Sequence, residues 1–192
     1  MLPRRAARWA TSLVAATSLV LGLWGLSSSG REPSLRPGTE VFAVDPDLVL
    51  EVSYRQGPVR MTARRHQPGE TFILVFWEQG RPGPSSCLAG PGFAKVLKEL
   101  TSLKLQRTLT AREEEGYFRS KPLSSWAELV IRDTSTLEPF RAKVLPAPGA
   151  ATGTLVHFRG TTYLVDLKGQ VFHLISGGCK TLGVQGEAAV RR

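Results

Sequence analysis

Short segments of alternating apolar and polar residues, separated by turn-forming residues, constrain this chain most strongly. Residues 48–55 alternate in polarity and lead into Gln56-Gly57-Pro58, after which residues 59–64 alternate again. A period of two puts successive side chains on opposite faces of a strand, so these segments predict a hairpin with one face toward a core. The 192-residue chain holds 19 glycines and 13 prolines, which favours many short strands and turns over a helical bundle.

Further segments have the composition of strands. The continuous apolar run at residues 72–77 predicts a strand that is covered on both faces. Arg159-Gly160 and Lys168-Gly169 are typical of tight breaks between consecutive strands. Beyond Pro122, the predicted strands are residues 126–133, 140–145, 154–158, 161–167 and 170–175.

One main amphipathic helix is predicted. It follows a loop at residues 80–92 that is too rich in proline and glycine to be regular. Apolar residues then recur at spacings of three and four from Phe93 to about Leu103, which predicts a helix packed on the sheet. Thr110 and Glu113 have the spacing of a capping box, so a short helical turn is also expected there. The predicted fold class is therefore α+β, a mainly antiparallel β-sheet domain with this one main helix.

An uncharged N-terminal segment precedes the domain. Residues Trp9 to Leu26 carry no formal charge and follow Arg4, Arg5 and Arg8. The segment is near the lower length limit for a membrane-spanning helix, and it is longer than a typical signal-peptide apolar region. A signal anchor is favoured, and a cleaved signal or a buried core helix stays open. The arginines favour a cytoplasmic N-terminus, with the rest of the chain outside the cytoplasm.

Four regions follow from these patterns. The prediction is a membrane anchor or signal segment at 1–26, a linker at 27–39, an extracytoplasmic α+β domain at 40–182 and a flexible tail at 183–192. The linker is polar and contains Pro33, Pro37 and Gly38 without any periodicity.

The formal net charge of +9 invites a search for a polyanion site. The basic residues are scattered, and the densest group is Arg60, Arg64 and Arg65. Arg60 and Arg64 are four residues apart, an even spacing that puts both on one face of a strand, so they are expected on the solvated face of a sheet. The three arginines are the predicted basic binding face for an anionic polymer, and no nucleic acid partner is expected.

Cys87 and Cys179 are the two cysteines of the chain. Two thiols are too few for a cysteine-rich zinc site, and neither belongs to a Cys-x-x-Cys motif. In an oxidising compartment they would pair as one disulfide if they meet in space. If they lie apart, Cys87 would be free for an intermolecular bond.

No set of residues predicts catalysis, a cofactor or a metal ion. His157 and His173 fall on neighbouring predicted strands and could approach each other, but no Asp or Cys lies at ligand spacing. The run 113–115 holds three adjacent glutamates, which point in different directions on a helix and cannot converge on one ion. The chain is therefore predicted not to be an enzyme.

The order of these elements resembles an uncharacterised bacterial extracytoplasmic domain family found beside auxiliary components of gliding-motility ABC transporters. The matching features are the opening VFAVDPDLVLEVSYRQGPVRMTARR, Phe76-Trp77 after a third strand, the helix GFAKVLKELTSLKLQRTL and the final TTYLVDLKGQVFHLI. They span roughly residues 41 to 176. This chain differs in its longer loop at 78–92 and in holding one copy of the pattern. The resemblance implies a membrane-associated accessory role and no reaction.

The first functional prediction is a non-catalytic accessory or scaffold domain that binds a protein of an envelope or transport assembly. It would be held at a bacterial cytoplasmic (inner) membrane by a single pass through residues 9–26, with the domain in the periplasm or outside the cell. The alternative is a binding module for a polysaccharide or another anionic envelope polymer, using the basic face.

Overall fold

The computed structural model describes residues 36–78, 80, 82–146 and 153–184. The chain divides into two compact units, Met1–Ser34 and Leu35–Arg192, and the second contains all the described residues. The predicted membrane segment at 9–26 and most of the linker lie outside these residues. Among the described residues, no helix is long and apolar enough to cross a membrane.

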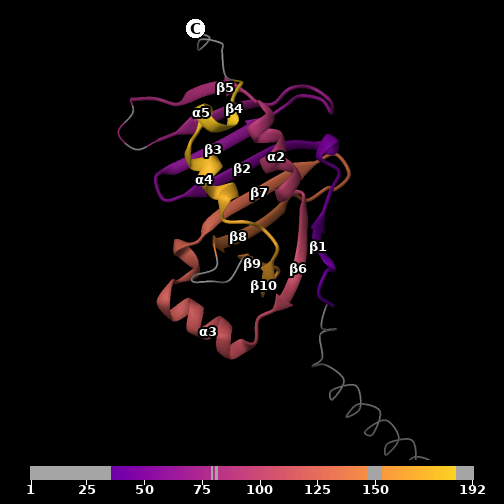
Figure 1. Ribbon diagram of the computed structural model, residues 1–192, viewed down its shortest axis with the longest axis vertical. Coiled ribbons are helices and arrows are strands. Elements are labelled where there is room, and N and C mark those ends of the chain that lie inside the picture. The colour runs from indigo at the N-terminus through magenta and orange to yellow at the C-terminus, as the bar shows by residue number, and fades with distance from the viewer. Residues whose placement is uncertain (1–35, 79, 81, 147–152, 185–192) are drawn as a thin grey trace, which may run out of the picture. The chain divides into compact units, whose positions relative to one another are not determined.

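A single antiparallel sheet of ten strands dominates the described domain (Figure 1). Its spatial order is β1-β6-β10-β9-β8-β7-β2-β3-β4-β5, and neighbouring strands all pair antiparallel. The strands are β1 (Glu40–Ala43), β2 (Val49–Gln56), β3 (Val59–Arg64), β4 (Ile73–Trp77), β5 (Ser85–Leu88), β6 (Ser102–Thr108), β7 (Ala127–Asp133), β8 (Phe140–Pro146), β9 (Thr154–Phe158) and β10 (Thr161–Val165).

A few helices accompany the sheet, so its mainly antiparallel character agrees with the predicted class. The α-helices are α2 (Pro91–Leu100), α3 (Ala111–Ser120), α4 (Gln170–Ser176) and α5 (Cys179–Leu182), and the 3-10 turns are η1 (Pro46–Leu48) and η2 (Leu123–Ser125). The prediction of one main helix was too simple, because α2 and α3 each have ten residues.

The main core lies between one face of the sheet and the helices α2, α4 and α5 (Figure 1). Helix α2 contributes a stripe that is fully or almost fully buried, namely Phe93, Val96, Leu97 and Leu100. Its first turn approaches α5 so closely that a Cβ on Gly92 would collide with the carbonyl oxygen of Thr181. Glycine at this position therefore lets the two helices pack against each other.

The helix α2 is shorter than the sequence predicted. It ends at Leu100, where the Thr101 hydroxyl donates to the Leu97 carbonyl at 2.8 Å. The chain then enters β6, which sequence analysis missed. Leu103 belongs to this strand, and it is buried there rather than on the helix. The alternation of Leu103 and Leu105 with Lys104 was the available signal.

The strand predicted at residues 170–175 is wrong, because the segment forms α4. Its buried residues are Val171, Phe172 and Ile175, a spacing that suits one side of a helix. The edge of β10 that a following strand would use is already paired with β6. A helix satisfies its own backbone hydrogen bonds, so it needs no free sheet edge.

Two further predictions about the β3–β5 region are wrong. The strand at 72–77 is covered on one face only, since Ile73 and Trp77 are 47% and 40% exposed. The loop at 80–92 contains a short strand, β5, which pairs with β4 at the sheet edge.

The predicted flexible tail begins later than the sequence suggested. Gly183, assigned to that tail by sequence, forms a bridge with Ala89, and Val184 N donates to the Leu88 carbonyl. The rest of that predicted tail lies outside the described residues.

Helix α3 packs on the opposite face of the sheet, over β8, β9 and β10. It contributes Tyr117 and Phe118 to a second, smaller apolar cluster, in which the Phe118 ring lies 5.8 Å from that of Trp126. The remaining members of this cluster are Leu109, Leu123, Leu145, Leu155 and Leu164.

The predicted capping box starts this helix. The Thr110 hydroxyl accepts from Glu113 N, and Glu113 Oε2 accepts from Thr110 N at 2.9 Å. Glu113 also accepts from Arg107 Nη1 at 2.8 Å. The hydrogen bond from Arg107, followed by those from Thr110, lowers the pKa of Glu113 from 4.5 to about 2. The ionised carboxylate therefore links the start of α3 to β6.

We expect the replacement Glu113→Gln to reduce the pH dependence of stability between about pH 4.5 and pH 2. A carboxyl group whose pKa is lower in the folded state stabilises the fold above its unfolded pKa. That stabilisation disappears as the pH falls through the folded value of about 2. Urea midpoints of wild type and variant should differ most at neutral pH and converge near pH 2. Glu115→Gln, on the same helix and away from Arg107, is the control; a constant difference at all pH values would contradict the assignment.

Candidate functional site

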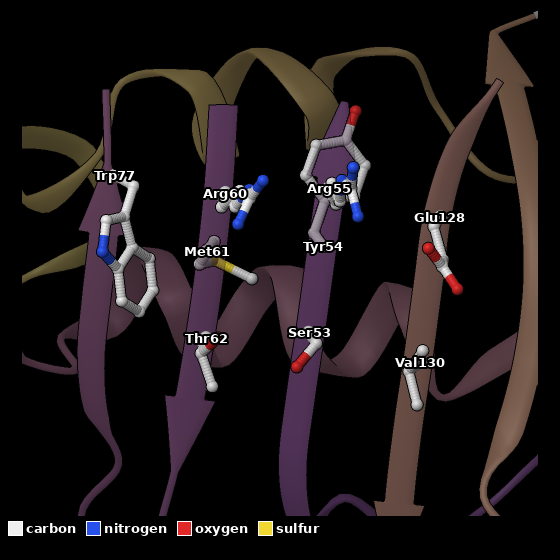
Figure 2. Close-up of a pocket in the computed structure, with 9 residues that line it drawn as sticks. All are labelled: Ser53, Tyr54, Arg55, Arg60, Met61, Thr62, Trp77, Glu128 and Val130. Carbon is white, nitrogen blue, oxygen red and sulfur yellow. The ribbon is translucent and has the colours of Figure 1, made fainter. Parts of the chain in front are cut away.

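Half of the sheet face that carries α3 is left without a helical cover. No described helix packs on the outer side of β7, β2, β3 and β4, because α2, α4 and α5 lie on the other face and α3 covers β8–β10. We call this surface the open face. Figure 2 shows the side chains of Trp77, Thr62, Ser53 and Val130 on the side of the strands away from the helices.

Strand register arranges the open face in three rows that cross the strands. Residues that are direct partners on adjacent strands lie side by side, with Cβ atoms about 4.5–5.5 Å apart. The first wall is Trp77, Arg60, Arg55 and Glu128, the floor is Val75, Thr62, Ser53 and Val130, and the second wall is Ile73, Arg64, Glu51 and Arg132. The walls carry long side chains and the floor carries short ones.

This difference in side-chain length forms a shallow groove across the strands. Two adjoining hollows, with volumes of about 300 and 480 Å³, lie along it, and both are lined by Thr62 and Trp77. Rows two residues apart on a strand are separated by roughly 6.7 Å, so the two walls are roughly 13 Å apart. That width suits one polypeptide segment, since a helix with its side chains is about 10–12 Å wide.

Exposed apolar side chains concentrate at the β4–β5 end of the groove. Ile73 and Trp77 lie in the two walls, and Leu88 of β5 is 48% exposed beside Ile73. Large aliphatic side chains gain free energy when a partner removes them from water. Exposed apolar groups gathered on one face are a common feature of interaction surfaces, so this end of the groove is the candidate contact region.

On the open face, both glutamates have cationic partners, but some of the arginines have no anionic partner among the residues that the structure describes. Glu51 forms an ion pair with Arg64 at 3.2 Å, and Glu128 lies 3.8 Å from Lys143. Arg55 and Arg60 lie directly opposite each other on β2 and β3, an arrangement that repels. Within the described part of the chain, neither guanidinium group has a hydrogen bond or an ion pair. The groove therefore has a local excess of positive charge beside Trp77.

Tyr54 lies next to Arg55, but its phenol carries no negative charge that could neutralise the arginines. Burial raises the pKa of Tyr54 to about 12, and its hydroxyl donates to Gln56 Oε1 at 2.7 Å. The phenol therefore stays neutral at physiological pH. Its ring belongs to the core and lies 5.8 Å from that of Phe172.

The structure separates the three arginines of the predicted basic face. Arg60 and Arg64 lie in opposite walls of the groove. Arg65 instead binds within the domain, where its Nε donates to the Val49 carbonyl at 2.6 Å and its Nη2 to the Pro46 carbonyl at 2.7 Å. Its guanidinium also lies 4.5 Å from the centre of the Phe72 ring. Arg65 thus holds the start of β2 against the β3–β4 connection.

The two cysteines meet in the structure. Cys87 of β5 and Cys179, the first residue of α5, form a disulfide with a Cα–Cα distance of 5.9 Å. The bond joins an edge strand to the last described helix across 92 residues of sequence. The disulfide lies on the core face of β5, so it stabilises the β5 end of the sheet without lining the groove.

The two histidines do not approach each other. His173 lies on α4, which packs on the core face, whereas His157 lies on β9 beneath α3. His157 Nδ1 lies 2.9 Å from Thr162 Oγ1, and the Thr162 hydroxyl donates to Glu114 Oε1. Since the hydroxyl has one proton and gives it to Glu114, the histidine nitrogen is the donor to threonine.

This polar cluster holds α3 to the sheet. Thr162 is 1% exposed, so its oxygen is not accessible to a substrate. His157 does not withdraw the hydroxyl proton, and it therefore lacks the role of a base that activates a nucleophile. No group of three or more His, Cys, Asp and Glu side chains in the described residues could hold a metal ion.

Sequence reasoning missed most of the groove. Val75, Val130 and Ile73 were assigned to buried or unspecified strand positions, because the apolar run of β4 hid which side chains face out. The alternation of β2 and β3 did place Arg60 and Thr62 on the solvated face. Continuing that register onto β4 would have found the exposed side of Trp77.

Comparison with known proteins adds no assignment. No family model, no curated protein and no solved structure matches this chain. The resemblance to the gliding-motility-associated domain family stays a prediction.

Proposed function

We propose that this chain is a non-catalytic accessory or scaffold domain that binds a partner protein through the open face. Its N-terminal segment would hold it at a bacterial cytoplasmic membrane with the domain outside the cytoplasm. The partner would belong to an envelope or transport assembly, as the family resemblance implies.

The exposed apolar side chains at the β4–β5 end of the groove are the observation that carries this proposal. Ile73 and Trp77 project from β4, an interior strand whose backbone groups are already paired with β3 and β5. Recognition must therefore use side chains, and tryptophan and arginine are the types that dominate binding energy at protein interfaces. Both types adjoin here, because Trp77 and Arg60 are direct cross-strand partners.

A non-catalytic role is supported by the way the polar groups are used. The histidine, threonine and glutamate that come together under α3 satisfy one another, and the threonine is buried. In the groove, the Ser53 hydroxyl donates to Glu51 Oε1 at 3.2 Å, and the same carboxylate is held in an ion pair with Arg64. These polar groups are therefore also used by one another.

The proposal predicts that Trp77→Ser weakens capture of a partner by about tenfold, the loss typical of an interface anchor. The tagged full-length chain would be cross-linked mildly in its native cells, purified, and its bound proteins quantified by mass spectrometry. Leu137→Ser is the matched control, because Leu137 is fully exposed in the β7–β8 turn and lines neither hollow of the groove. Equal capture by both variants would exclude the open face as the binding surface.

The alternative function is binding of an anionic envelope polymer. The exposure of Arg60 and Arg64 on one face favours it, although Arg64 is paired with Glu51 and the floor between them contains Val75 and Val130. Binding of a polyuronate that is lost in moderate salt and in the Arg60→Ala/Arg64→Ala double variant would support this alternative. Binding that is insensitive to salt would contradict it.

A further inference from the structure

We propose that the groove binds one acidic segment of the partner polypeptide, with a carboxylate at Arg55 and Arg60 and an apolar side chain against Trp77. This inference rests on the proposed function and specifies its ligand chemistry. It concerns the whole width of the open face, from Leu88 at the β5 edge to Glu128 on β7.

Charge complementarity argues for an acidic segment. The two walls hold four arginines against two glutamates, namely Arg55, Arg60, Arg64 and Arg132 against Glu51 and Glu128. Both glutamates already have cationic neighbours within 4 Å, in Arg64 and Lys143. The arginines left without an ion pair among the described residues are Arg132 in the second wall and the adjacent pair Arg55 and Arg60 in the first. A carboxylate between two guanidinium groups would relieve their repulsion and accept paired hydrogen bonds.

The apolar groups argue for a polypeptide rather than a glycan. Val75 and Val130 in the floor and Ile73 in the wall have no hydrogen-bonding side-chain atoms. A sugar hydroxyl placed against these three side chains would lose water without gaining a hydrogen bond, which costs free energy. Aliphatic or aromatic side chains of a polypeptide would instead be buried against these residues.

Position also favours this part of the sheet. The equivalent outer surface over β8–β10 is covered by α3, whose Phe118 and Tyr117 pack on apolar side chains of the sheet. The open face repeats that combination of an apolar patch and flanking charges without a described segment upon it. The partner segment would pack on β7, β2, β3 and β4 in the way that α3 packs on β8, β9 and β10.

The inference is tested with a photo-cross-linking amino acid at Ser86, an exposed position beside Val75 at the end of the groove. The full-length chain would be irradiated in its native cells, and the linked peptide sequenced by mass spectrometry. The expected adduct is an acidic segment of a protein. Adding Arg60→Glu should lower its yield about tenfold, whereas Arg119→Glu on the exposed side of α3 should not change it. Circular dichroism of each variant verifies folding.

The outcomes separate this inference from the proposed function. A protein adduct at a neutral or basic segment, or a yield unaffected by Arg60→Glu, overturns the acidic-segment inference and leaves a protein partner in place. A glycan or lipid adduct at Ser86 overturns both and favours the polymer or the membrane surface. The same cross-linker at Lys98, on the exposed side of α2, is the control position. Protein adducts from Lys98 and none from Ser86 would show that the partner binds another surface, and they would overturn the proposal that the groove is the binding site.

Discussion

Removal of the Cys87–Cys179 disulfide should lower the free energy of unfolding by about 4–5 kcal/mol, in the chain-entropy account of a loop this long. The bond closes 92 residues of sequence and joins β5 to α5. Its loss frees the unfolded chain more than it changes the folded contacts. The Cys87→Ala/Cys179→Ala double variant and the oxidised wild type would be compared by urea unfolding of the full-length chain.

The single variant Cys87→Ala tests whether the cross-link causes this loss. It already lacks the bond, so it should be destabilised nearly as much as the double variant. Wild type unfolded in the presence of a reductant should approach the same value. A double variant within about 1 kcal/mol of oxidised wild type would contradict the entropic account. Two alkylated thiols in protein taken from its native compartment, without reductant, would contradict the bond itself.

Leu100→Ala is expected to cost about 2–5 kcal/mol, the range for truncating a fully buried leucine. Leu100 is 0% exposed at the end of the α2 stripe and packs in the main core. The loss contains the transfer free energy of the removed atoms and a contribution from the cavity left behind. Denaturant unfolding of variant and wild type measures it.

The same substitution at Leu137 provides the matched control. Leu137 is fully exposed between β7 and β8, so Leu137→Ala should change stability by less than about 0.5 kcal/mol. If both substitutions cost the same, then α2 would not pack on the sheet as described.

Sequence reasoning succeeded where a pattern depends only on residues that are close together in the chain. The β2–β3 hairpin and the β9–β10 hairpin were predicted because each is formed by neighbouring residues with a turn between them. The buried stripe of α2 was predicted for the same reason, since its spacing is a local property. The capping box of α3 was also readable, because Thr110 and Glu113 are three residues apart. Sequence predicted only a short turn there, whereas the helix continues to Ser120.

Two of the failures involve contacts between distant segments. The apolar residues 170–175 were assigned to a strand, although their partner edge on β10 belongs to β6. Residues 72–77 were assigned two buried faces, yet only the face toward the main core is covered. Neither result can be read from the segment itself, because it depends on which other segment reaches the same place.

Sequence alone therefore determined the alternation of the hairpin strands, the helix stripe and the presence of two cysteines that an oxidising compartment would allow to pair. The tertiary structure decided that Cys87 and Cys179 meet, that Arg65 is used internally and that Arg55 and Arg60 stand opposite each other beside Trp77. The physical reason is that side-chain period is set by neighbouring residues along the chain. Which face stays uncovered is set by strand register and by where α3 packs, and these depend on pairings across the whole domain.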